Sequence, residues 1–355
     1  MTYQHKNQFP AYLLVSTNYR LTASASSKIP GISLVSALAS ENIFEIIDTL
    51  SIIRSPKCIK PLYFSFMSLI RLKKDRNFRE IFFYNFNVVY LFYYFILLVK
   101  GFKISLFLAD GLNCIGIYKF PQLYRWLFFR IVTLSYPAEQ NLFSKTLRGR
   151  VYWFPGSISH YPFELEAMKN IQFSSSSSSL VSSSSPYFLY NSSILPWNGA
   201  SDLLYLANIR TDLKFLVTGQ KNDFASCVNS NFIPDNITFI GILPYQDYLN
   251  VLLRSSGVVL FRDERNPFNQ YNFPSKALEA LRFNIPIISA YIISGLPLSY
   301  YQLIECHSFL HASFGHETIK KDALGTNDSE QLKIQLFANA TSLSNLKTWI
   351  SLFKP

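Results

Sequence analysis

Cysteine is scarce in this chain, which has four cysteines among 355 residues. They lie far apart and form no CxxC pair, at Cys58, Cys114, Cys227 and Cys306. This spacing excludes a disulfide framework and a cysteine-based zinc site, and it suits buried thiols in a reducing compartment. Three histidines lie between residues 307 and 316, but no supporting cysteine or carboxylate pattern surrounds them, so we expect no metal site.

Acidic residues are also few, since 22 Asp and Glu stand against 33 Lys and Arg, a net charge of +11. A basic surface attracts anionic nucleotides, nucleic acids or lipid head groups, although solubility alone would also account for it. Five basic residues fall within residues 71–79, directly after the aromatic and apolar run 61–70. This pattern suits a solvated basic loop, or a helix that makes a peripheral membrane contact through a basic and aromatic surface. We expect no nucleic-acid partner.

The first residues lack the charged, then apolar, then small-residue order of a signal peptide. We therefore expect a cytoplasmic enzyme, with any membrane contact at the inner face of the membrane. Global disorder is excluded, because 49% of the residues are hydrophobic and the chain has 32 Phe and 22 Tyr. A chain of this length can form two domains, each with its own core.

One uncharged stretch, residues 81–99, is about as long as a membrane-spanning helix. Asn85 and Asn87 interrupt it, and Tyr and Phe dominate its composition. We predict a buried strand at 81–86, a core helix at 88–100 and, after Gly101, a second strand at 103–108. This strand–helix–strand order fits a parallel sheet, and a membrane span is the alternative.

Strands alternate with helices on both sides of a serine-rich tract. In the first half we expect further strands at 12–16, 44–47, 131–135 and 151–154, and helices at 32–39, 118–129 and 141–145. Such alternation indicates an α/β protein with doubly wound, Rossmann-like sheets. The tract at 174–185 is polyserine broken only by Leu180 and Val181, and its composition predicts a flexible linker.

The alternation restarts after the linker, with strands at 187–190, 214–217 and 237–240 and a helix at 200–206. The strand at 214–217 stops at Thr218 and Gly219. From Ile240 onward come a GILPY turn, a helix, a buried strand and a polar loop. A second helix opens with Pro274-Ser275-Lys276 and precedes an apolar strand at 287–290, and a last helix is expected near 344–353.

The joint occurrence of the GILPY turn and the PSKALE helix resembles the donor-binding half of the nucleotide-sugar glycosyltransferases with the GT-B fold, in particular the retaining family 4. The resemblance implies two Rossmann-like domains facing each other across a cleft. Residues 1–173 would bind the acceptor, residues 186–340 the nucleotide sugar, and residues 341–355 would pack back on the first domain. It also implies sugar transfer with retention, without a metal or cofactor, in cell-surface polysaccharide or lipid-linked glycan assembly.

The PSKALE helix has the features that a leaving diphosphate requires. Negative charge builds on the diphosphate as the bond to the sugar breaks, and a helix N-terminus with a nearby cation stabilises it. Pro274 suits the first turn, and Lys276 lies in that turn, beside Ser275. Glu279, three residues on, lies on the same helical face as Lys276. In the resembling family the matching Glu binds the ribose hydroxyls; a surface helix with a Glu–Lys pair is the alternative.

Two neighbouring segments depart from the family pattern. Tyr271 stands where many members have a second Glu near the donor sugar, although the Pro-Ser-Lys subgroup commonly lacks it. Polar side chains of the same loop, including Arg262 and Asn272, are candidate replacements. The stretch 190–199 resembles the loop that usually ends in Lys-Gly, but it ends in Asn198-Gly199 and is neutral. Phosphate binding would then rest on backbone amides and on Lys276 or Arg262.

In the first domain, Asp110 follows the strand at 103–108 and is the candidate acidic group near the acceptor hydroxyl, unless it is only a turn residue in Asp-Gly. The candidate catalytic residues are thus Asp110, Lys276 and Arg262. The candidate nucleotide-sugar-binding residues are Glu279, Ser275, Tyr271, Asn272, Asn198 and Gly219. The expected partners are a nucleotide-diphosphate sugar and a glycan or lipid-linked acceptor. The alternatives are a GT-B-fold binding partner without turnover and a nucleotide-sugar epimerase on the same fold.

Overall fold

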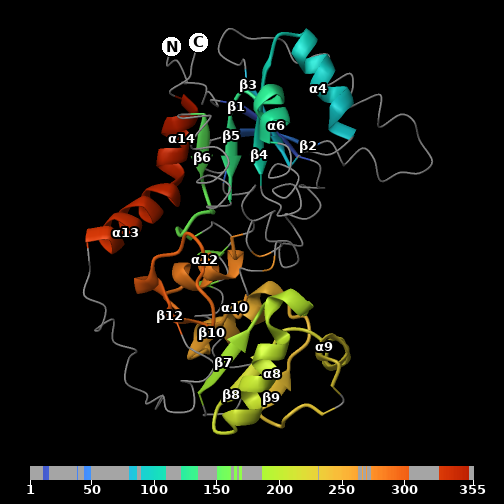
Figure 1. Ribbon diagram of the computed structural model, residues 1–355, viewed down its shortest axis with the longest axis vertical. Helices are drawn as coiled ribbons and strands as arrows, with labels where there is room; N and C mark the ends of the chain where they lie inside the picture. The colour runs from blue at the N-terminus through green and yellow to red at the C-terminus, as the bar shows by residue number, and fades with distance from the viewer. Residues whose placement is uncertain are drawn as a thin grey trace, which may run out of the picture. The chain divides into compact units, whose positions relative to one another are not determined.

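The chain folds into two compact units, one formed by residues 1–157 and 339–355 and the other by residues 158–338 (Figure 1). The computed structural model describes residues 11–15, 38, 44–48, 80–85, 89–108, 121–134, 150–160, 164–165, 168–169, 186–230, 232–262, 266, 269, 273–303 and 328–351. Each unit is built around its own parallel sheet.

The sheet of the first unit has the strand order β2-β1-β3-β4-β5-β6, and its strands pair in parallel. This is a doubly wound order, with its switch point between β1 and β3. The strands are β1 Ala11–Val15, β2 Phe44–Asp48, β3 Glu80–Tyr84, β4 Lys103–Leu108, β5 Ile131–Thr133 and β6 Val151–Trp153. The described helices are α4 Val89–Val99, α6 Pro121–Leu127 and α14 Leu343–Ser351.

The uncharged stretch at 81–99 forms β3 and α4, which confirms the predicted strand and helix. β3 is buried throughout, as expected for a strand covered on both faces. Asn85 ends it in a left-handed conformation (φ 56°), which asparagine tolerates better than most residues. α4 has 11 residues. Within the described part of the chain, the helices are all too short or too polar to cross a bilayer.

A buried ion pair joins the last helix to the sheet of the first unit. Arg130 is fully buried, and its Nε donates to Glu80 Oε1 at 2.8 Å. Its Nη2 donates to Glu80 Oε2 and, at 3.0 Å, to the carbonyl of Ile350 in α14. Leu346 and Ile350 also lie in one apolar cluster with Phe82 of β3 and Phe107 of β4. The residues at 343–351 are therefore part of the core of the first unit.

The sheet of the second unit has the order β12-β11-β10-β7-β8-β9, again parallel throughout. Its strands are β7 Tyr187–Tyr190, β8 Lys214–Val217, β9 Ile237–Phe239, β10 Gly257–Val259, β11 Ile287–Ser289 and β12 Gln302–Leu303. Its helices are α8 Ala200–Ile209, α9 Lys221–Val228, α10 Tyr245–Arg254, α12 Ser275–Arg282 and most of α13 Asp328–Ala340, with two short 3-10 turns, η3 Pro196–Asn198 and η4 Leu298–Tyr300.

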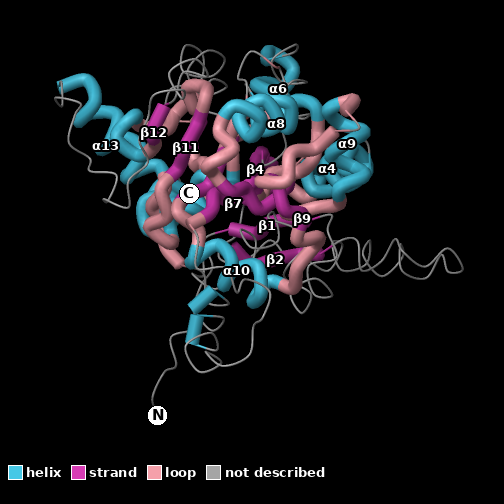
Figure 2. Tube along the Cα trace, turned by 90° about the horizontal axis from the view of Figure 1, so that it is seen from below, coloured by secondary structure: helices cyan, strands magenta, loops and turns pink. Residues whose placement is uncertain are grey.

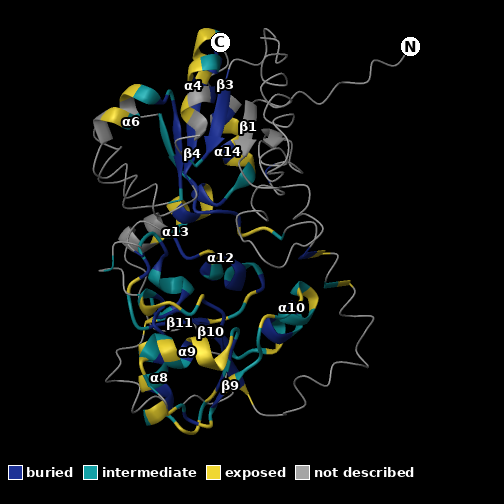
Figure 3. Ribbon diagram, turned by 90° about the vertical axis from the view of Figure 1, so that its right-hand side faces the viewer, coloured by how far each residue is buried: buried dark blue, intermediate teal, exposed yellow. Residues whose placement is uncertain are grey.

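Helices cover both faces of this second sheet, and Figure 2 shows α8 and α10 on opposite sides of β7. Alternate residues of β7 serve the two faces, as the strand period requires. Phe188 and Tyr190 pack with Leu203 of α8 in the main apolar cluster. The Tyr187 hydroxyl instead donates to the carbonyl of Val251 in α10 at 2.8 Å. The central strands are accordingly buried (Figure 3).

The predicted fold class, doubly wound Rossmann-like α/β, is confirmed by both sheets. The helix predicted to open at Pro274 begins at Ser275, and the last helix, predicted at 344–353, begins at Leu343 and is described as far as Ser351. Two helices, α9 and α13, had no sequence prediction. The predicted helices at 32–39 and 141–145 and the polyserine linker lie outside the described residues, apart from the helical, buried Leu38.

Candidate functional site

The strand order of the second unit identifies where a ligand would bind. Counted along the chain, the order is 3-2-1-4-5-6, so the direction of winding reverses between β7 and β10. Ligands of open α/β sheets bind outside the carboxyl ends of the strands at such a switch point. Asn191 directly follows β7, α10 precedes β10 and α12 follows β10 in the chain. Side chains from these three segments meet.

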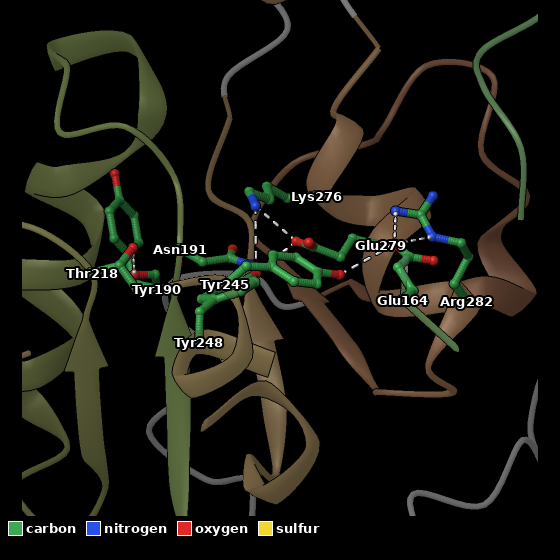
Figure 4. Close-up of polar contacts among 9 residues, drawn as sticks. All are labelled: Glu164, Tyr190, Asn191, Thr218, Tyr245, Tyr248, Lys276, Glu279 and Arg282. Carbon is green, nitrogen blue, oxygen red and sulfur yellow. Dashed lines mark hydrogen bonds and ion pairs between the residues drawn. The ribbon is translucent and has the colours of Figure 1, made fainter. Parts of the chain in front are cut away.

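Asn191, Tyr248, Lys276 and Glu279 form one hydrogen-bonded network (Figure 4). The Tyr248 hydroxyl, from α10, donates to Glu279 Oε2 at 2.6 Å. Lys276 Nζ, one turn earlier in α12 than Glu279, donates to the same oxygen at 2.8 Å. Asn191 Nδ2 donates to the Tyr248 hydroxyl at 2.6 Å. Lys276 Nζ also lies over the Tyr248 ring, 4.8 Å from its centroid, a cation–π contact.

The network is largely shielded from solvent, and its one negative charge is paired. Glu279 is 7% exposed and Asn191 is 6% exposed. Burial raises the pKa of Tyr248 well above its usual value, and the charge of Glu279 raises it further. Tyr248 therefore remains a protonated donor at neutral pH. Because Lys276 offsets the carboxylate, the buried charge of Glu279 costs less than an isolated one would.

Two acceptor oxygens of this network receive no hydrogen bond from the residues that the structure describes. Asn191 Oδ1 is buried and accepts no hydrogen bond from any described residue. The described contacts of Glu279 all fall on Oε2, so that Oε1 accepts none from the described residues either. For a buried oxygen such as Asn191 Oδ1, the missing hydrogen bond costs about 1–3 kcal/mol. A bound group with hydroxyl donors would satisfy both oxygens.

A second buried cluster supports the network from the same two helices. Arg282, at the end of α12, forms an ion pair with Glu164 at 3.1 Å, and both side chains are almost fully buried. The Tyr245 hydroxyl, at the start of α10, donates to Glu164 Oε1 at 3.4 Å. Burial raises the pKa of Tyr245, and the charge of Glu164 raises it further. Glu164 thus ties α10 to α12, which holds Tyr248 and Glu279 in register.

Arg262 lies in a third group of polar contacts, after β10. Its Nε and Nη2 donate to Asn269 Oδ1 at 3.0 and 2.8 Å. Asn269 Nδ2 in turn donates to the carbonyl of Trp197 in η3. Burial lowers the pKa of Arg262 to about 10, so the side chain is still a cation at neutral pH. The cation that the sequence suggested for phosphate binding therefore also braces the loop that follows β7.

The loop between β7 and α8 depends on Asn198 and Gly199. Asn198 Nδ2 donates to the carbonyl of Ser193 at 2.9 Å, and the Asn198 carbonyl accepts from the Tyr190 hydroxyl at 3.0 Å. Gly199 has φ +80°, and a Cβ there would lie 2.0 Å from the carbonyl oxygen of Phe261. Asn198 is thus occupied in shaping the loop, and only glycine fits at the position that follows it.

The sequence-predicted residues separate into three groups. The structure brings Lys276 and Glu279 together, and it places Ser275 in an exposed position at the first residue of α12. Gly219 follows β8 with φ 142°, and its N–H donates to the carbonyl of Gly241 at 3.1 Å. Asp110, Tyr271 and Asn272 lie outside the described residues, and their predicted roles stay predictions.

Sequence reasoning did not identify Tyr248, Asn191, Tyr245, Glu164 and Arg282 as site residues. Both tyrosines belong to the turn–helix segment that carried the family resemblance, so that segment was the available signal. Asn191 opens the loop that was compared with the family pattern, but its contact with Tyr248 spans 57 residues of sequence. Nothing in the local sequence marks Glu164, whose partner Arg282 is 118 residues away.

Comparisons with known proteins agree on the fold. No family model matches the sequence, and no curated protein matches it significantly. Among solved structures, a glycosyltransferase from Rickettsia africae ESF-5 matches with a TM-score of 0.53 and 12% identity, over 96% of each chain. A UDP-GlcNAc 2-epimerase from Neisseria meningitidis, bound to UDP-GlcNAc, matches with a TM-score of 0.48 and 10% identity, over 97% of this chain and 100% of that one. WaaG, a glycosyltransferase involved in lipopolysaccharide biosynthesis, matches with a TM-score of 0.45 and 10% identity, over 96% and 93%.

At these identities the likeness concerns the fold alone, and TM-scores under 0.5 support no further argument. The Rickettsia match and the two parallel sheets agree with the predicted class, so the chain has the GT-B type of architecture with Rossmann-like units. Its assignment to the retaining family 4 stays a prediction.

Proposed function

We propose that this protein is a glycosyltransferase that moves a sugar from a nucleotide-diphosphate sugar to a hydroxyl acceptor. The observation that carries the proposal is a pair of acceptors at the switch point of the second sheet, Asn191 Oδ1 and Glu279 Oε1, which accept no hydrogen bond from the described residues. Ribose and hexose rings present adjacent hydroxyl donors, which two such oxygens can bind. The resemblance assigns the ribose contact to Glu279, and Asn191, in the same network, would be a second acceptor for sugar hydroxyls.

The leaving diphosphate would bind at the start of α12. The first backbone N–H groups of a helix are free to donate to an anion, and Lys276 lies in that first turn. Lys276 is paired with Glu279 in the described structure. When ribose hydroxyls donate to Glu279, the ammonium group can turn toward the phosphates, so that its charge follows the negative charge of the leaving group. Arg262 would be the second cation of this unit that binds the phosphates.

The acceptor side of the proposal rests on the first unit. Asp110 would lie near the acceptor hydroxyl, and the acceptor would be a glycan or a lipid-linked glycan at the inner face of the membrane. We further propose that no metal takes part and that the anomeric configuration is retained, as the sequence resemblance implies. We also propose that the other residues predicted from the sequence contribute to the nucleotide-sugar site: Tyr271, Asn272, Ser275, Asn198 and Gly219.

One observation favours a second candidate, a nucleotide-sugar-binding protein without turnover. The loop that follows β7 has no cation between Asn191 and Gly199, and its Asn198 side chain donates to a backbone carbonyl. The diphosphate would then be held by fewer charges than is usual for the resembling family. This candidate shares the binding site with the enzyme, so that binding and turnover have to be measured separately.

Thermal melting against UDP-, GDP-, ADP- and TDP-sugars tests the binding site. Ligand at about 100 times its Kd stabilises the folded state by ~2.7 kcal/mol, which raises the midpoint by several degrees. We expect a shift with one nucleotide, its loss in Glu279→Gln, and its retention in Asp223→Asn, a matched amide substitution at an exposed position of α9. No shift in the wild-type protein at millimolar ligand would contradict a nucleotide-sugar site.

Product analysis with the nucleotide sugar that binds then separates the candidates. Sugar transfer, or slow hydrolysis of the donor, supports the glycosyltransferase. Conversion to an epimeric nucleotide sugar without any acceptor would identify an epimerase. Binding with no turnover would identify the protein that only binds.

A further inference from the structure

Helix α4 presents an apolar face to solvent. Its 11 residues, VYLFYYFILLV, contain no charged side chain. One face is buried and carries Tyr93, Tyr94 and Leu97. The exposed side chains are Leu91 (38%), Phe95 (58%), Leu98 (50%) and Val99 (88%). Because they recur at intervals of about one helical turn, they form a continuous stripe along the helix.

Helix α6 lies beside α4 and extends this apolar surface. The Tyr94 hydroxyl of α4 donates to the carbonyl of Leu127, the last residue of α6, at 2.6 Å. The Tyr94 ring also meets Phe128 edge-on, with centroids 6.1 Å apart. α6 contributes Leu123, 50% exposed, and Trp126, 82% exposed. Exposed positions are visible on both helices in Figure 3. We call these six exposed side chains, on α4 and α6, the α4–α6 face.

Basic residues outnumber acidic ones in the stretch of sequence that carries this face. From residue 81 to residue 138 the sequence contains a single acidic residue, Asp110, against five basic ones: Lys100, Lys103, Lys119, Arg125 and Arg130. Arg130 is paired internally with Glu80. Lys100 directly follows α4, and Lys103 opens β4 in an exposed position, with Nζ 4.4 Å from the centroid of the Phe129 ring. Lys100 and Lys103 thus form a cationic margin at the end of α4.

We infer that the α4–α6 face docks on the surface of an anionic lipid bilayer. Contiguous exposed apolar side chains are rare on soluble monomers and mark a surface that is covered by a partner. Apolar and aromatic side chains beside lysines match the two layers of such a bilayer, its acyl boundary and its negative head groups. An exposed Trp is typical of side chains at that interface.

This surface differs from the one that the sequence suggested at residues 61–79, which lies outside the described residues. The inference deepens the proposed function, and it rests on that function only for its purpose: docking would bring the first unit to a lipid-linked acceptor. Docking itself requires neither the donor nor Glu279. Vesicle binding can therefore fail while nucleotide binding succeeds, and the reverse.

Vesicle co-sedimentation of the full chain, with phosphatidylglycerol-containing and pure phosphatidylcholine vesicles, tests the inference. We expect binding to the anionic vesicles that weakens with salt. The triple variant Phe95→Gln, Val99→Gln, Trp126→Gln should lose about tenfold or more in partitioning, because it removes most of the exposed apolar contact. The control pair Phe232→Gln, Ile242→Gln, exposed apolar positions of the second unit, should bind like the wild type.

The cationic margin is tested with Lys100→Gln and Lys103→Gln. Each should weaken binding to anionic vesicles about fivefold, the equivalent of ~1 kcal/mol per lysine. Equal binding of the wild type and the triple variant would overturn the inference. So would a dimer in light scattering that the triple variant dissociates, because the face would then cover a second copy of the chain. Circular dichroism of each variant confirms that the fold is intact.

Discussion

At the scale of single residues, the most informative side chain is Glu279. Two described neighbours donate to one of its oxygens, and no described residue donates to the other. The carboxylate is therefore held in a fixed orientation through Oε2, while Oε1 can still accept a hydrogen bond from a ligand. Lys276 and Tyr248 thus have two roles, since they lower the cost of burying the charge and they fix the orientation of the carboxylate.

The first prediction concerns the Tyr248 hydroxyl. In Tyr248→Phe, Asn191 Nδ2 loses its acceptor and Glu279 loses one of two donors, so we expect a loss of about 1–3 kcal/mol in the free energy of unfolding. The midpoint shift with the nucleotide sugar should fall as well, because Glu279 is less well oriented. Urea unfolding and thermal melting with ligand measure the two effects.

Tyr187→Phe is the matched control for that variant. It also removes a buried tyrosine hydroxyl, which donates to the Val251 carbonyl in the same helix α10. We expect a similar loss of stability and an unchanged ligand-induced shift. If both variants reduced the ligand-induced shift equally, Tyr248 would have no specific role in positioning Glu279.

At the scale of elements, the site depends on how closely the segments after β7 and β10 approach each other. Gly199 is pressed against the backbone of Phe261, and Asn269 bridges Arg262 to Trp197. These contacts fix the loop after β7 and the loop after β10 against each other at the carboxyl end of the sheet. A change at their contact should affect the fold first and the site as a consequence.

The second prediction is that Gly199→Ala destabilises the second unit by about 2–4 kcal/mol. The alanine would have to adopt a left-handed backbone conformation, and its Cβ would lie 2.0 Å from the Phe261 carbonyl oxygen. Gly241→Ala is the control, because its φ is also positive (+70°) but its nearest neighbour is 3.8 Å away. We expect only about 1 kcal/mol there, from the backbone alone. Equal losses in urea unfolding would contradict the close contact.

Most of the strands and helices could be predicted from the sequence, whereas contacts between distant segments could not. Strong alternation of apolar runs and helical segments was enough for every described strand except β12 and for α12, where Pro274 and the motif gave the start. Lys276 and Glu279 were found because their contact lies within one helix. α9 (KNDFASCV) escaped prediction because it is short and only Phe224 is buried along it. The Asn191–Tyr248 and Glu164–Arg282 contacts join distant segments, and no local pattern encodes them.

At the scale of the whole molecule, the chain forms two units, and the first unit is completed only by residues that follow the second unit in the sequence. The first unit needs residues 339–355, since Leu346 and Ile350 lie in its core and Arg130 donates to the Ile350 carbonyl. The second unit is continuous from 158 to 338. Stability of the first unit should therefore respond to substitutions near the distant end of the sequence.

The third prediction is that Leu346→Ala lowers the stability of the first unit by about 2–5 kcal/mol, because Leu346 is fully buried and the substitution leaves a cavity. Leu336→Ala, at a position 45% exposed, should cost less than about 1 kcal/mol. Amide hydrogen exchange followed separately in β3–β5 and in β7–β10 locates the effect. Faster exchange in the second unit alone would contradict the assignment of α14 to the first core.

The fourth prediction is a loss of stability at alkaline pH. Burial raises the pKa of Tyr152 and Tyr187 from 10.0 to about 12, and it raises the pKa of Tyr190, Tyr245 and Tyr248 further. Between pH 10 and about 12 the folded state then binds more protons than the unfolded state. Stability therefore falls as the pH rises, and it is fully present only below the unfolded pKa.

The titration of Arg262 changes the free energy of unfolding in the opposite direction. Its pKa falls to about 10 in the folded state, so between pH 10 and 12.5 the unfolded state binds the extra proton and the fold gains stability. Five tyrosines outweigh one arginine, and we expect a falling urea midpoint above pH 10 with a cooperative rise in tyrosinate absorbance as the protein unfolds. A gradual rise centred near pH 10, with the fold retained, would show that these hydroxyls are accessible to solvent.

The participation of residues 339–355 in the first unit also has a consequence for biosynthesis. The acceptor carbonyl for Arg130 is made 220 residues after the arginine, a delay of about 10–40 s at ordinary rates of translation. Throughout that time the earliest part of the chain waits on the ribosome with part of its core uncovered, while the second unit can already close. The half that is synthesised first is thus finished last, and its apolar surface is exposed for longer to aggregation.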